Sequence, residues 1–184
     1  MDCRCPSGYI NPVIYFMTEP LEPPDIFHLR AACGWLELGN HLEANEELEN
    51  ITPKLRAHPD VLEIRWQIYA KEFKWDACVD IARAITKLDP ARDSGWIHLA
   101  YSTRRATNGG LEAARNILTS AAEKFPTVPI IPYNLACYAC QLGNLKEAWQ
   151  WLEKAFDIGD SKKLKLMALD DHDLEPLWTD ISEI

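Results

Sequence analysis

One pattern recurs four times along this chain of 184 residues: a turn residue is followed five positions later by a small side chain. The four pairs are Gly39 with Ala44, Phe73 with Cys78, Gly109 with Ala114, and Gly143 with Ala148. Successive copies are 34, 36 and 34 residues apart. An internal repeat of this length is typical of stacked supersecondary units. The spacing therefore predicts a repeat protein, a class whose usual role is to present an extended surface to a partner.

Composition supports a folded chain and excludes some partners. Hydrophobic residues make up 47% of the sequence, which is enough to build a core. The formal net charge is -9. Nucleic acids and anionic membrane surfaces are bound through clustered Lys and Arg, so we expect neither as a partner. The charge selects no particular protein partner and leaves the oligomeric state open.

The sequence also indicates a compartment. It contains no run of about 18 apolar residues, the length a membrane span needs, and no secretory pattern at its start. The six cysteines are scattered, whereas a disulfide scaffold is smaller and richer in Cys. We therefore expect a cytoplasmic protein with reduced thiols at Cys3, Cys5, Cys33, Cys78, Cys137 and Cys140.

The chain divides into three parts. Residues 1–24 carry five prolines and predict an irregular arm. Met17 is followed by Thr-Glu-Pro and resembles an ordinary translation start. Residues 1–16 are therefore either native or an upstream extension that was assigned to the protein in error. Residues 25–160 hold the four repeats, and residues 161–184 predict a capping segment of one or two short helices, since a terminal repeat must hide its open face.

The repeats are expected to be helical, because no segment alternates with a period of two. Asp25 and Asn40 are expected to cap helices, with Glu43 completing a capping box that recurs at Asn144 and Glu147. The glycine before each Asn is expected to end the preceding helix. The predicted helices span 25–38, 41–57 (broken near Thr52-Pro53), 60–72, 75–88, 93–107, 110–124, 130–141 and 144–158.

These units resemble the tetratricopeptide repeat, in its small bacterial form, over about 25–160. The fourth copy carries the pattern best, with Leu135-Ala136, Gly143, Ala148, Leu152, Ala155 and Phe156. The third has Trp96, Leu99-Ala100, Gly109, Ala114, Leu118, Ala121 and Pro126. The first has Ala32, Trp35, Gly39, Ala44, Leu48 and Ile51, and the second has Trp66, Tyr69, Cys78, Ala82, Ile85 and Pro90. The resemblance implies an all-α superhelix of about four helix-turn-helix repeats.

The resemblance also implies a function: a non-catalytic scaffold that binds a peptide or partner helix on the concave face formed by the first helices. Three residues on that face, Arg30, Arg104 and Asn134, are expected to be able to hold a carboxylate. The full set of Lys, Asn and Arg residues with which members of the family bind the tails of chaperones is absent, so we do not predict chaperone binding. Carried over by register, the candidate contacts are Arg30, Cys33, Glu37, Glu63, Gln67, Lys71, Tyr101, Arg104, Arg105, Tyr133, Asn134, Cys137 and Gln141.

Two other functions stay open. A secretion chaperone is also small, acidic and built from similar repeats. A thiol redox protein using Cys137 and Cys140 is disfavoured, because the pair lies near the C-terminal end of a predicted helix, where the helix dipole opposes a thiolate. No hydrolase elbow, phosphate loop or metal-ligand spacing occurs. We expect no enzymatic activity, no cofactor and no metal.

Packing expectations follow from the register. Ala44, Ala114 and Ala148 should lie at close contacts between helices, where only small side chains fit. The tryptophans Trp35, Trp66 and Trp96 should be in the core. Because Trp149 and Trp151 are two residues apart, they cannot share a helix face, and one should be more exposed than the other.

Overall fold

The structure is a computed structural model that describes residues 19–183, and its regular elements are all helical, which confirms the all-α prediction. Most of the predicted arm, residues 1–18, lies outside the described residues. The elements are α1 (Asp25–Glu37), α2 (His41–Asn50), η1 (Pro53–Leu55), α3 (Pro59–Lys71), α4 (Trp75–Leu88), α5 (Asp93–Thr103), α6 (Leu111–Lys124), α7 (Ile130–Gln141), α8 (Leu145–Ile158), α9 (Ser161–Leu169), η2 (His172–Leu177) and α10 (Trp178–Ser182).

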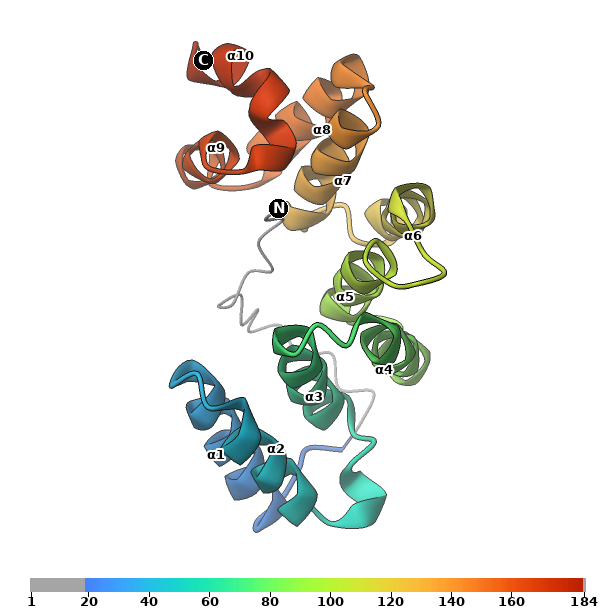
Figure 1. Ribbon diagram of the computed structural model, residues 1–184, viewed down its shortest axis with the longest axis vertical. Helices are drawn as coiled ribbons and strands as arrows, with labels where there is room; N and C mark the ends of the chain where they lie inside the picture. The colour runs from blue at the N-terminus through green and yellow to red at the C-terminus, as the bar shows by residue number, and fades with distance from the viewer. Residues whose placement is uncertain (1–18, 184) are drawn as a thin grey trace. The chain divides into compact units, whose positions relative to one another are not determined.

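The helices form two compact units, and the chain passes from the first to the second between residues 108 and 109, inside the third predicted repeat. In the first unit α1 packs against α2 and α3, α3 packs against α4, and α4 packs against α5 (Figure 1). In the second unit α7 packs against both α6 and α8. Helices that are consecutive in sequence are thus neighbours in space within each unit, as stacked helical pairs require.

In the first, second and fourth repeats the turn residue ends its helix through a left-handed backbone. Gly39, Phe73 and Gly143 have φ of 79°, 58° and 81°. At each site the following amide donates to a carbonyl five residues earlier, the Schellman pattern: Asn40 to Trp35 at 2.8 Å, Lys74 to Tyr69 at 3.0 Å, and Asn144 to Ala139 at 2.9 Å. Phe73 therefore occupies a glycine position, as its place in the repeat predicts.

The third turn differs from the prediction. The helix α5 ends at Thr103 rather than at 107, and the positive φ belongs to Gly110, the residue before α6, rather than to Gly109. The loop after α5 is held by α4, because the Asp76 carboxylate accepts hydrogen bonds from the Thr107 amide at 2.9 Å and hydroxyl at 2.7 Å. This side-chain anchor explains the longer turn.

The predicted caps are partly right. The Asn40 side chain accepts from the Glu43 amide at 3.2 Å, but the Asn40 amide donates to Trp35, so the reciprocal bond of a capping box does not form. Asn144 makes no side-chain cap. The break near Thr52-Pro53 is confirmed, since α2 ends at Asn50 and a short 3-10 turn follows.

The small residues of the repeat lie at the centre of the packing. Ala44, Cys78, Ala114 and Ala148 are completely buried, as the spacing predicts. A small side chain at this position lets neighbouring helices approach closely, while larger apolar residues fill the flanks. The cores of the two units contain, among others, Leu29, Leu48, Ile51, Trp66, Ile68, Leu118, Leu135 and Leu152.

The tryptophans follow the prediction less well. Trp66 is buried, but Trp35 is 36% exposed and Trp96 is only half-buried. Trp35 lies on α1, and no helix in the described part of the chain precedes α1 to cover it. Trp149 and Trp151 are both half-buried, and the expected difference in their exposure stays a prediction.

The C-terminal segment consists of α9, η2 and α10, drawn in red in Figure 1. It packs on α7 through η2 and on α8 through α9. Its buried residues Leu174, Leu177 and Ile181 provide the apolar contact, and the Trp178 indole donates to the Ala168 carbonyl at 2.9 Å.

Candidate functional site

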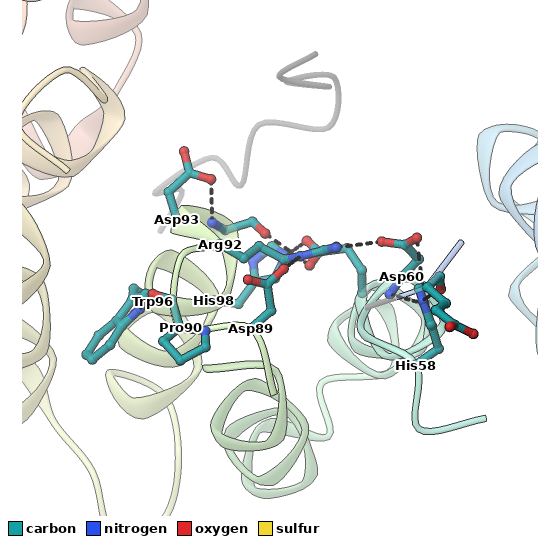
Figure 2. A network of polar contacts seen from close by, with 11 residues as sticks. His58, Asp60, Asp89, Pro90, Arg92, Asp93, Trp96 and His98 are labelled. Carbon is teal, nitrogen blue, oxygen red and sulfur yellow. Dashed lines mark hydrogen bonds and ion pairs between the residues drawn. The ribbon is translucent and has the colours of Figure 1, made fainter. Parts of the chain in front are cut away.

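A network of polar side chains joins α3 to α5 and the loop before it (Figure 2). Arg92 donates to Asp60 at 2.7 Å and to Asp89 at 3.1 Å. Glu63 accepts from the Ser94 hydroxyl at 3.1 Å and forms a short contact with His98 Nε2. These bonds bring α3 and α5 together with fixed side-chain positions.

The electrostatics of this network favour an ionised Glu63. Burial opposes the charge, but the His98 ring and its hydrogen bond, together with the Ser94 hydroxyl and Arg92, hold the pKa of Glu63 below its ordinary value. A carboxylate in this position accepts bonds from α5 and the loop before it. Glu63 is therefore better described as a positioning residue than as an open contact for a partner.

An aromatic cluster lies beside the polar network. The His98 ring stacks on Trp66 with centroids 3.7 Å apart and planes 9° apart. Tyr101 meets Trp66 edge-on at 6.0 Å and Trp75 at 5.8 Å. The Arg105 guanidinium lies 3.6 Å from the centre of the Tyr101 ring. This face of the first unit thus presents a guanidinium held against an aromatic ring.

The structure places eight other predicted contacts on α1, α3, α5 and the residues that follow α5. Arg30 and Glu37 on α1 and Lys71 on α3 are exposed. The remaining five are half-buried: Cys33, Gln67, Tyr101, Arg104 and Arg105. Helix α3 packs against both α1 and α5, so these residues belong to one continuous group of first helices within the unit.

The predicted contacts on α7 are in a different environment. Tyr133, Asn134 and Cys137 are buried, which corrects the expectation that they face an open surface. The C-terminal segment covers this face: the Tyr133 hydroxyl donates to Asp171 at 3.2 Å, and the Cys137 thiol contacts the same carboxylate at 3.6 Å. The fourth residue, Gln141, is exposed but its amide donates to the Asp173 carbonyl at 3.3 Å.

The thiols of Cys137 and Cys140 are both buried in α7 and are not joined in a disulfide. Burial, with the nearby Asp173 and Asp171, raises the pKa of Cys140 above its ordinary value. A raised pKa lowers the thiolate fraction, and the thiolate is the reactive form. The environment of this pair is the opposite of the one that activates a redox cysteine.

A shallow cleft of about 460 Å³ lies between α8 and the C-terminal segment in the second unit. Leu145 and Trp149 line one side of it, and Pro176 and Leu177 line the other. The Trp149 indole donates to Glu153 at 2.8 Å, so its N–H is already engaged. Among residues 19–183 no group of three or more His, Cys, Asp or Glu is arranged to hold a metal ion.

Sequence reasoning missed the contacts of His98, Arg92 and Trp75, although a signal was present. Several pairs that touch are about one repeat apart: Glu63 and His98 by 35 residues, Asp60 and Arg92 by 32, and Arg115 and Glu147 by 32. In a stack of repeats, equivalent positions in neighbouring repeats lie side by side. A search for complementary charges at that separation would have found these pairs.

Known proteins share this fold at low sequence identity. TTC0263, a tetratricopeptide-repeat protein of Thermus thermophilus, matches with a TM-score of 0.69 at 17% identity, over 85% of this chain and 82% of that chain. A structure of MamA matches with a TM-score of 0.64 at 13% identity, over 76% and 81%. A second, MamA MSR-1 C2, matches at 0.60 and 16%, over 76% and 78%. The predicted tetratricopeptide-repeat fold is thereby confirmed.

No protein-family model and no curated protein gives a significant match to the sequence. Within residues 19–183, none of the helices combines the length and the apolar character that crossing a bilayer requires.

Proposed function

We propose that this chain is a non-catalytic, cytoplasmic scaffold that binds a protein segment, either a peptide or a partner helix, along the first helices α1, α3 and α5. The observation that carries the proposal is the Tyr101–Arg105 pair, in which the guanidinium lies 3.6 Å from the centre of the aromatic ring. The helices that carry this face, α3 and α5, are held together by the hydrogen bonds of Glu63. A pre-positioned face lowers the entropic cost of binding. The shared fold supports the same role.

The proposed contacts are the exposed and half-buried members of the predicted set: Arg30, Cys33, Glu37, Gln67, Lys71, Tyr101, Arg104 and Arg105. Glu63 acts from beneath this surface by holding α5. Tyr133, Asn134 and Cys137 are left out because they are buried, and Gln141 because its amide is engaged by Asp173.

The chemistry of these residues favours a segment that carries carboxylate or carbonyl acceptors. Arg105 already uses one donor on the Tyr101 carbonyl at 2.9 Å, and its planar group can offer others while stacked on the ring. Lys71 is exposed on the neighbouring helix. The formal charge of -9 disfavours nucleic acid as the partner.

Site-specific photocross-linking tests the proposal. A photoreactive amino acid replaces Gln67 on the proposed face, and in a matched control it replaces Asp80, whose side chain is exposed on α4. In lysate of cells that make the protein, we expect one defined protein to cross-link at position 67 and not at position 80. Arg105→Glu should abolish that cross-link. Equal capture at both positions, or capture that survives Arg105→Glu, would show that this face is not the binding site.

A further inference from the structure

Three large apolar side chains are exposed to solvent at the turns of the first and second repeats. Leu38 is 77% exposed, Leu42 is 66% exposed and Phe73 is 75% exposed. We call these three residues the turn-edge patch. They lie at the α1–α2 and α3–α4 turns, and Phe73 touches Trp75, which in turn meets Tyr101. Exposed apolar side chains that gather in one region often mark an interaction surface.

The two turns are neighbours in the structure. His41 Nε2 lies 3.8 Å from Glu72 Oε1, and this contact joins the start of α2 to the end of α3. Leu42 directly follows His41, and Phe73 directly follows Glu72. The apolar side chains of the patch are therefore carried by adjoining segments of one unit.

Phe73 is costly for the fold in two ways. Its φ of 58° is a left-handed conformation that a bulky residue seldom adopts, and the equivalent turns use Gly39 and Gly143. Its ring is also mostly in water, with an edge contact to Trp75 at 6.0 Å. Neither backbone preference nor burial favours Phe here. A strained, exposed residue of this kind is a reason to look for a binding role.

The surroundings of the α1–α2 turn, which carries Leu38 and Leu42, are acidic. Glu37, Glu43 and Glu46 are all exposed, and none of the ion pairs among residues 19–183 involves them. Helix α2 contains four Glu and no Lys or Arg, and α1 has no basic residue in its last turn. The α3–α4 turn differs, since it carries the exposed Lys71 and also Lys74, which is engaged with Glu72 at 2.5 Å.

We propose that the turn-edge patch binds a basic amphipathic helix of another protein, with apolar residues against Leu38, Leu42 and Phe73 and with Lys or Arg beside the carboxylates of the α1–α2 turn. Packed helices are roughly 8–10 Å apart, and apolar residues at i and i+7 of a helix are separated by about 10 Å. One helical ligand can therefore reach both turns. A second copy of this chain is disfavoured, because it would bring carboxylates against carboxylates in a protein with a net charge of -9.

Binding is measured with a fluorescein-labelled synthetic helix of about four turns, with Leu along one stripe and Lys elsewhere. The comparison probe has Glu in place of every Lys. We expect the Lys helix to raise the fluorescence anisotropy on titration with the full chain, more weakly as salt increases. The Glu helix should not bind. Equal binding of both helices, or no binding of the Lys helix at low salt, would overturn the proposal.

Two variants locate the site. Leu42→Ser and Phe73→Gly should each weaken binding roughly tenfold or more, as the loss of a central anchor does. Thermal unfolding shows whether the fold is retained, and Phe73→Gly is informative because glycine suits the turn. Leu166, an exposed leucine of α9 at 71%, gives the matched control Leu166→Ser, which should bind normally.

Two further outcomes would count against the proposal: unchanged affinity in the folded Phe73→Gly variant, or self-association of the wild type that Leu42→Ser abolishes, because a second copy would then occupy the patch. Sedimentation velocity of both proteins distinguishes that second case.

Discussion

The carboxylate of Asp25, at the start of α1, holds Thr52, which follows the end of α2, through hydrogen bonds from the Thr52 amide at 2.6 Å and hydroxyl at 3.1 Å. Asp25 is buried and does not cap its own helix, which corrects the sequence-based expectation. Asp76 and Thr107 make the same arrangement in an exposed setting. The Asp–Thr fork thus closes a pair of antiparallel helices at their open end.

The buried fork predicts a clear stability effect. Asp25→Ala leaves the Thr52 amide without its acceptor and should lower the free energy of unfolding by about 1–3 kcal/mol. Thr52→Val removes only the hydroxyl bond and should cost about 0.5–1.5 kcal/mol. Urea unfolding followed by circular dichroism measures both. Equal midpoints for the wild type and Asp25→Ala would mean that the fork does not stabilise the unit.

The buried small residues predict intolerance to larger ones. Ala148→Leu places three more carbons in a completely buried contact and should cost roughly 1–3 kcal/mol by overpacking. Ala113→Leu, on the exposed side of α6, is the matched control and should be nearly neutral. The two variants are compared by denaturant midpoint. If both shift equally, Ala148 is not at a close helix contact.

The Glu63 contacts predict a pH dependence. Because the folded pKa of Glu63 is lowered, its contribution to stability is present above the ordinary value of 4.5 and is lost as the pH falls through the folded pKa. Glu63→Gln should destabilise the protein at pH 7 by roughly 1.5–3 kcal/mol, and the difference from wild type should shrink in acid. Urea titrations at neutral and acid pH test this. Glu46→Gln, at an exposed carboxylate, should show no such convergence.

Features that depend on local backbone geometry could be predicted from the sequence, whereas contacts between residues far apart in the chain could not. The periodic small residues and the left-handed turn at Phe73 were predictable, because each depends on the repeat register and on local backbone geometry. Asp25 and Glu147 were assigned to helix caps, yet they bind Thr52 and Arg115, which lie 27 and 32 residues away. Local sequence does not say which of two acceptable partners a carboxylate takes.

The exposure of the candidate residues was predictable only where residues later in the chain do not cover them. On α1 and α3 the register placed Arg30, Glu37 and Lys71 in solvent, as observed. On α7 the same register failed for Tyr133, because Asp171 in the C-terminal segment folds over it. The position of a capping segment depends on the whole apolar surface that it covers, which no single repeat encodes.

The backbone of Phe73 predicts a stabilising substitution. Phe73→Gly removes the strain of a bulky residue at φ 58° and should raise the free energy of unfolding by up to about 1 kcal/mol, offset in part by the added freedom of the unfolded chain. Gly39→Phe, at the matched turn, should lower it. Thermal melts of the two variants give the comparison. If Phe73→Gly is destabilised as strongly as Gly39→Phe, the contact of Phe73 with Trp75 outweighs the backbone strain.

The burial of the α7 thiols predicts their reactivity and bears on the redox alternative. Cys137 and Cys140 are buried, and the raised pKa of Cys140, caused by burial and by Asp173 and Asp171, reduces its thiolate further. Burial, together with Glu37 and Asp60, raises the pKa of Cys33 as well, so the accessibility of each thiol sets the order of reaction. With iodoacetamide at neutral pH, the half-buried Cys33 should be alkylated before either of the buried α7 thiols, and both of these should react fully in denaturant. Peptide mass spectrometry over time measures each site. Rapid labelling of Cys140 in the native protein, ahead of Cys33, would instead identify an activated thiol and support the redox alternative.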